Sequence, residues 1–173
     1  MTTAKIILLV VNIIGGMAVI GSYVLGLSGK TDGTNALWGG MPLSVRPVYT
    51  ISMIISALGY FAFLHFILFR LNPASFNFNI LYLIFLGILV PSAFWMPLTN
   101  AFVANPGTAL WIIIRLVLAI VGLSSCALAG VLISLHTRET GFAYWLAVAG
   151  SVYFAFHTAI LDMILWPIFF RMQ

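Results

Sequence analysis

The sequence predicts an all-α protein, an integral membrane bundle of five transmembrane helices. The 173-residue chain is 63% hydrophobic and 6% charged, with a mean hydropathy of +1.18, which leaves too little polar surface for a domain in water. Apolar stretches also reach the ~20 residues that a helix needs to cross a bilayer. They cover about 6–27, 48–69, 78–97, 109–134 and 142–169. Backbone groups in lipid must pair within their own segment, which favours helices.

Local sequence features refine this prediction for two of the stretches and for the first connecting segment. The first exceeds the ~7–15 apolar residues of a signal-peptide core, so we expect a retained helix. The segment 28–47 is rich in glycine and proline but also carries Trp38, so we expect it to fold over one end of the bundle. Pro91 should kink the third helix, because it removes a backbone hydrogen bond. The chain is therefore read as one transmembrane domain, 1–173, with no soluble domain.

The predicted location is an integral, multi-pass membrane protein of undetermined orientation. Three basic residues flank each side of the predicted bundle, so the positive-inside rule does not decide. They are Lys5, Arg70 and Arg138 on the N-terminal side, and Lys30, Arg46 and Arg171 on the other. The hydropathy predicts the lipid bilayer as a partner. The basic residues are scattered singly, so no nucleic acid is expected as a partner. The single cysteine, Cys126, permits no internal disulfide.

Small residues recur at every fourth position in the last two stretches. A hairpin about Arg138 would bring the two series to matching depths, which predicts close packing of these helices. The predicted pairs are Gly122 with Ala155, Cys126 with Ser151, and Gly130 with Ala147. In the same hairpin Arg115 and Asp162 would lie at the same depth in the membrane. Because a charge in lipid needs a partner, these two are expected to pair. The sequence therefore predicts a buried ion pair between these two residues.

Four of the five tryptophans belong to the end of the bundle opposite the N-terminus. An interfacial aromatic belt is one explanation. A small-molecule cavity is another, because such sites combine aromatic walls with a few polar groups. The candidate ligand-binding residues are Trp38, Trp95, Trp111, Arg115, His157, Asp162 and Trp166.

No catalytic motif and no metal-ligand cluster is recognised in the sequence, so a non-enzymatic protein is favoured over an enzyme. The cofactor is unknown, and haem or porphyrin is left open. A haem site would use His65, His136 or His157. His65 and His157 differ by ~15 Å in depth at ~1.5 Å per residue, so they do not suit one haem together.

Three segments are similar to parts of a known family: MPLSVRPVYTISMIISALGYF before and in the second helix, PSAFWMPL in the third, and VYFAFHTAILD in the fifth. Together with the five-helix layout they resemble the translocator protein family, also called tryptophan-rich sensory proteins or peripheral benzodiazepine receptors. Asp162 stands where the family has an asparagine. The resemblance implies a bundle that binds porphyrins, sterols or similar flat apolar molecules in a cavity closed by the first loop.

Three functions are therefore carried forward. The first is a non-enzymatic membrane binding or sensory protein for a hydrophobic small molecule, porphyrin- or sterol-like, in a tryptophan-lined cavity. The second is an accessory transmembrane subunit of a larger membrane complex. The third is a redox subunit that holds haem b or quinone. A homodimer and a larger membrane complex are both left open as assemblies.

Overall fold

A computed structural model describes residues 2–28, 33–73, 76–135 and 141–170. Within these ranges the chain is helical, and five helical segments are long and apolar enough to cross a membrane. The predicted fold class and the predicted multi-pass membrane location are confirmed. The membrane-crossing segments are α1 (Thr3–Leu27), α3 (Arg46–Phe69), α4 (Phe78–Ala104), α5 (Thr108–Ser134) and the continuous run Phe142–Phe170.

The fifth crossing segment consists of three pieces. It begins as α6 (Phe142–Ala155), continues as a π-helix, η2 (Phe156–Leu165), and ends as α7 (Trp166–Phe170). A π-helix of this length is unusual, because most occur as single turns inside α-helices, often at functional sites. The side chains after Ala155 therefore point in other directions than a continuous α-helix would give them.

The helix ends follow local sequence. Pro47 stands in the first turn of α3, where its missing N–H costs nothing. The Asn77 side chain accepts a hydrogen bond of 3.0 Å from the Asn79 N–H at the start of α4. α4 runs through Pro91 and Pro97 and ends only at Ala104, beyond the predicted limit of 97. Asn105, which precedes Pro106, ends it, since the residue before a proline disfavours helical geometry.

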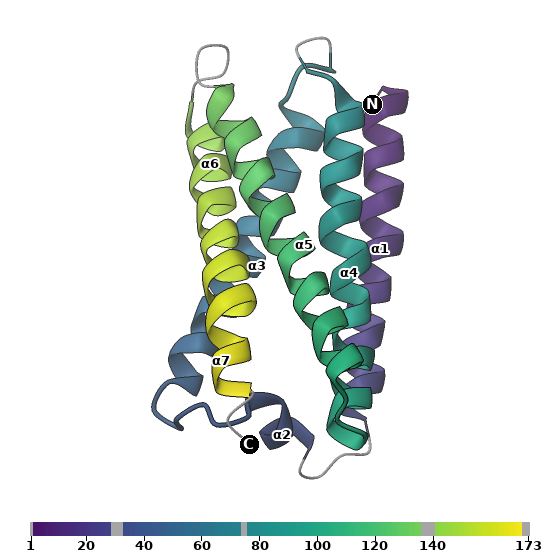
Figure 1. Cartoon of the computed structure of the whole chain (residues 1–173). Coiled ribbons are helices and arrows are strands. Elements are labelled where there is room, and N and C mark those ends of the chain that lie inside the picture. The colour runs from purple at the N-terminus through teal and green to yellow at the C-terminus, as the bar shows by residue number, and fades with distance from the viewer. Residues whose placement is uncertain (1, 29–32, 74–75, 136–140, 171–173) are drawn as a thin grey trace.

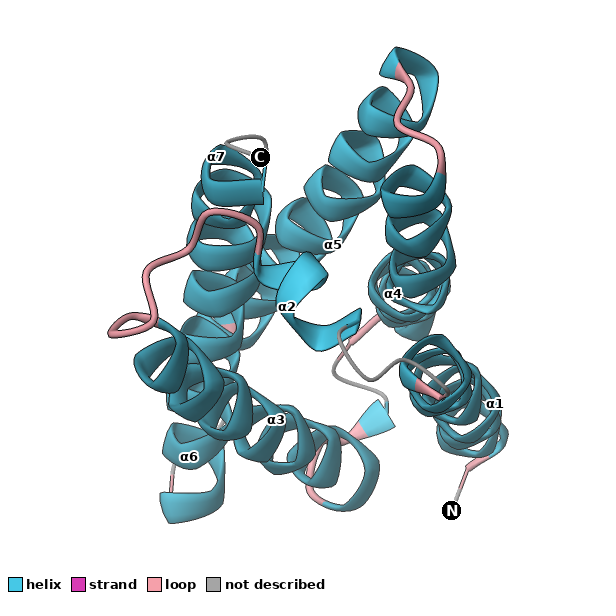
Figure 2. Cartoon of the chain, turned by 90° about the horizontal axis from the view of Figure 1, so that it is seen from below, coloured by secondary structure: helices cyan, strands magenta, loops and turns pink. Residues whose placement is uncertain are grey.

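The helices pack mainly as neighbouring pairs. α4 lies between α1 and α5, and α6 lies between α3 and α5, whereas α1 and α3 touch each other little (Figures 1 and 2). The short helix α2 (Gly33–Trp38) lies across the end of the bundle opposite the N-terminus (Figure 2). There the Gly40 N–H donates to the Phe169 carbonyl at 2.8 Å. The first connection therefore covers one end of the bundle.

A close backbone approach joins α3 to α6 and was not predicted. A Cβ placed on Gly59 would lie 2.6 Å from the carbonyl oxygen of Gly150, and one placed on Gly150 would lie 2.8 Å from that of Gly59. Only glycine at both positions permits this approach. Ser52 and Ser56 precede Gly59 on the same buried side of α3. Such a series of small residues is typical of a close membrane-helix contact.

The predicted contact between α5 and the last segment is correct only in part. Ala147, Ser151 and Ala155 are buried, and so is Gly122. Gly122, however, faces Ala159, whose Cα would lie 3.1 Å from an added Cβ, and not Ala155.

The predicted contacts of Cys126 with Ser151 and of Gly130 with Ala147 are wrong. Both Cys126 and Gly130 are exposed, and nothing lies within 4 Å of a Cβ placed on Gly130. A four-residue step advances about 40° round a helix of 3.6 residues per turn. The series beginning at Gly122 therefore leaves the inward face of α5 after one residue.

The hydrophobic core is larger at the end of the bundle where the N-terminus lies than at the opposite end. Phe63, Phe66, Phe85 and Tyr144 are among its fully buried side chains there. A second, smaller cluster lies under α2 and includes Tyr49, Ile114, Trp166 and Phe170. The candidate site lies between these two clusters.

Candidate functional site

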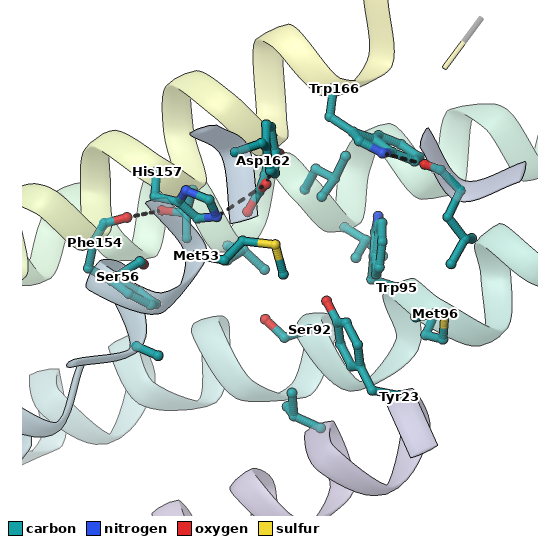
Figure 3. Close-up of a pocket in the computed structure, with 18 of the residues that line it drawn as sticks. Tyr23, Met53, Ser56, Ser92, Trp95, Met96, Phe154, His157, Asp162 and Trp166 are labelled. Carbon is teal, nitrogen blue, oxygen red and sulfur yellow. Dashed lines mark hydrogen bonds and ion pairs between the residues drawn. The ribbon is translucent and has the colours of Figure 1, made fainter. Parts of the chain in front are cut away.

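A cavity of about 470 Å³ lies inside the bundle on the side of α2. Every described helix contributes to its wall. The residues that contribute polar atoms include Tyr23, Tyr49, Ser92, His157 and Asp162, and the aromatic wall includes Trp38, Trp95, Phe154 and Trp166. Figure 3 labels most of them. This volume falls within the ~300–1,000 Å³ of small-molecule sites, and the mixture of apolar walls with a few convergent polar groups is typical of them.

Asp162 forms the acidic end of the cavity. The Tyr49 hydroxyl, from α3, donates a hydrogen bond to its Oδ1. Nε2 of His157 lies 3.7 Å from the same oxygen. The His157 side chain keeps 6% of its exposure, whereas that of Asp162 keeps 30%. The carboxyl group is therefore held on one oxygen and partly exposed. Figure 3 shows its contact with His157.

The π-helix brings His157 and Asp162 together. Residues five apart point in clearly different directions in an α-helix, since each residue turns the chain by about 100°. In a π-helix the hydrogen bonds run from residue i to i+5, so residues five apart lie one turn apart on one face. His157 and Asp162 are five apart and both lie in η2. The local helix geometry thus creates the pair.

A hydrogen-bonded chain continues from His157 into α3. Nδ1 of His157 lies 2.9 Å from the Ser52 hydroxyl. The Tyr153 hydroxyl donates to Ser52 at 3.1 Å, and the Ser52 hydroxyl can in turn donate to Nδ1. In that arrangement the imidazole proton is on Nε2, which faces Asp162.

The order Ser52, His157, Asp162 contains the residue types of a serine-hydrolase triad. Nucleophilic catalysis needs a serine hydroxyl that substrate can reach. Ser52 is buried and is not among the residues that line the cavity, and its oxygen already accepts from Tyr153. The arrangement therefore fixes the imidazole and does not present a nucleophile.

The aromatic wall is built from rings that contact one another. The Tyr23 and Trp95 rings stack with centroids 5.7 Å apart, and Trp95 meets Trp166 edge-on at 5.4 Å. Nε1 of Trp166 donates to the Leu37 carbonyl at 3.0 Å and so joins α7 to α2. Nε1 of Trp95 is buried and has no hydrogen-bond partner among the described residues.

Backbone and side-chain contacts hold the covering segment over the cavity. Gly39 has a φ of +54°, and a Cβ there would lie 2.5 Å from Cα of Phe170, so both its conformation and its contact require glycine. The Arg46 guanidinium donates to the Met41 carbonyl at 3.1 Å and to Oδ1 of Asn35 at 2.9 Å. Trp38 lies edge-on to Tyr49 at 5.6 Å. The cover is thereby coupled to the residue that binds Asp162.

The structure brings five of the seven candidate residues to this cavity. They are Trp38, Trp95, His157, Asp162 and Trp166. Trp111 packs instead against Phe102 and Phe170, with ring centroids 5.6 and 6.0 Å away. Arg115 is exposed on the outer surface of α5.

The predicted ion pair between Arg115 and Asp162 is therefore wrong. Asp162 interacts with Tyr49 and His157. Ile114 and Leu118 occupy the inward face of this part of α5. Arg115 lies about 100° round the helix from Ile114 and points outward. Its long side chain is near a helix end, where it can extend toward the membrane surface.

Tyr23, Tyr49 and Ser92 also line the cavity and were not predicted to do so. Tyrosine within a span carries a hydroxyl that must find a partner in lipid, and this signal could have marked Tyr49 as the partner of a buried acid. Tyr23 carries the same signal, whereas Ser92 carries none, because a helical serine can donate to its own backbone, as Ser92 does to the Ile88 carbonyl.

Among the described residues, no two histidines lie close enough together to bind one haem. His65 is exposed and packs on Phe69, with ring centroids 5.1 Å apart, and His136 lies outside the described residues. In the described part of the chain there is no group of three or more histidine, cysteine or acidic side chains arranged to hold a metal ion.

Comparison of the chain with models of protein families, with curated proteins and with solved structures finds no match.

Proposed function

We propose that this chain is a non-enzymatic membrane protein that binds a hydrophobic small molecule, sterol- or porphyrin-like, in the cavity beneath α2. The observation that carries the proposal is the cavity itself: about 470 Å³, with three tryptophans and one acidic end, within a membrane bundle. A flat apolar molecule would bury its faces against the indole rings, while one polar group would meet the Asp162 end.

The helix arrangement supports access from the bilayer. α1 packs mainly on α4, and α3 packs mainly on α6, so few contacts close the seam between α1 and α3. Tyr23 of α1 and Met53 of α3 both line the cavity, and Met53 is 39% exposed. We propose that a molecule dissolved in lipid enters through this seam.

Binding is tested by titrating the purified protein, in nanodiscs, with a sterol and with protoporphyrin, and measuring bound ligand directly. Trp95→Ala removes an indole from the cavity wall and should weaken binding about tenfold or more, since burying a large aromatic face contributes over 1.4 kcal/mol. Trp145→Ala is the matched control, because Trp145 is 57% exposed at the opposite end. Absence of saturable binding to the wild type, or equal loss in both variants, would overturn the proposal.

A further inference from the structure

The acidic end of the cavity has an unused hydrogen-bond acceptor. Tyr49 and His157 both approach Oδ1 of Asp162, and no described residue makes a hydrogen bond or ion pair with Oδ2. Asp162 is also the only acidic side chain within the described residues. A carboxyl group away from bulk water is stabilised by a donor or a cation, and each oxygen can accept more than one hydrogen bond. The geometry therefore presents an acceptor to whatever occupies the cavity.

The rings around this acceptor favour positive charge. Tyr49 binds the carboxyl group directly, and the Tyr23 and Trp95 rings line the cavity below it (Figure 3). The faces of such rings attract cations within ~6 Å, more strongly where water is excluded. A ligand carboxylate at the same place would instead lie beside a like charge, which is unfavourable at close range.

We infer that the cavity selects a lipophilic amine: a rigid apolar body of sterol size whose protonated nitrogen donates to Oδ2 of Asp162. This inference rests on the proposed function and specifies its ligand class. Asp162 is then the group that orients the ligand, since the other charged candidate, Arg115, is exposed on the outer surface of α5. A neutral hydroxyl can donate to the same oxygen, so the order of affinity is amine, then alcohol, then carboxylate.

The test uses three probes with one ring system: a 3-aminosteroid, the 3-hydroxysteroid and the steroid 3-carboxylic acid. The full chain is placed in phosphatidylcholine nanodiscs, and partition into empty nanodiscs is subtracted for each probe. In the wild type the amine should bind about 10- to 100-fold more tightly than the carboxylate, as expected for a hydrogen bond to a charged group. Asp162→Asn should remove this preference and retain affinity for the alcohol. Trp145→Ala, whose indole is 57% exposed at the opposite end of the bundle, should retain the preference.

The outcomes separate the two proposals. Equal binding of the three probes, tighter binding of the carboxylate, or an amine preference that survives Asp162→Asn would overturn the inference and leave the binding function standing. If no probe binds saturably to the wild type, the proposed function falls with it. If Asp162→Asn does not fold, the order of affinities in the wild type decides alone.

Discussion

Tyr49 and Asp162 are joined by a hydrogen bond from the first turn of α3 to the π-helix, across 113 positions of sequence. Tyr49→Phe removes this donor and should lower the free energy of unfolding by about 1.5–3 kcal/mol, the range for hydrogen bonds to charged groups. The measurement is denaturation in detergent micelles. Tyr23→Phe is the control, because no hydrogen bond of the Tyr23 hydroxyl is found within the described residues. Equal stability of the two variants would contradict the role given to Tyr49.

The pairing of Asp162 is tested separately by two double-mutant cycles. Tyr49→Phe combined with Asp162→Asn should show coupling, because the side chains are in contact. Arg115→Gln combined with Asp162→Asn should be additive within about 0.5 kcal/mol, as for residues without a shared partner. Strong coupling between Arg115 and Asp162 would support an ion pair between them and contradict the pairing of Asp162 described above.

The glycine contact between α3 and α6 gives a second stability prediction. Gly59→Ala would place a methyl group against the Gly150 backbone, so the helices must separate, at a cost of about 1–3 kcal/mol or more. Gly130→Ala should have almost no destabilising effect, because nothing lies within 4 Å of the added Cβ. Thermal unfolding of both variants checks this. A stable Gly59→Ala variant would show that this crossing is looser than described.

Neighbouring positions in α5 test which face points inward. Ser125 is fully buried and Cys126 is exposed. Ser125→Leu should destabilise the bundle by overpacking, by about 1–3 kcal/mol. Cys126→Leu should be tolerated, because leucine is at home in lipid. The reverse result would support the original prediction that Cys126 faces the last helix.

Hydropathy and span length were sufficient to predict the five crossing segments, because lipid imposes length and internal backbone pairing on any helix that crosses it. The packing was harder. Gly59 and Gly150 belong to helices that are not consecutive, so no hairpin count could pair them. The prediction that Gly122 is buried was correct. Each four-residue step turns about 40° round the helix, so Cys126 and Gly130 lie on the outer surface.

The candidate site was predicted where it depends on residue type and depth. Trp95, Trp166 and Asp162 lie at the end of the bundle where the tryptophans were counted. The partner of Asp162 could not be predicted, because its direction depends on the π-helix. The sequence of Phe156–Leu165 contains no signal that distinguishes a π-helix from an α-helix of 3.6 residues per turn.

Blocking the cavity tests most directly whether it is a binding site. Ser92 points into it from α4, and its hydroxyl donates to the Ile88 carbonyl of the same helix, so Ser92→Phe adds a ring to the cavity (Figure 3). Leu83→Phe, on the same helix and 72% exposed in the wild type, is the matched control. Sterol and aminosteroid binding should be saturable in the wild type and in Leu83→Phe and lost in Ser92→Phe. Binding by Ser92→Phe equal to that of the wild type would contradict the account.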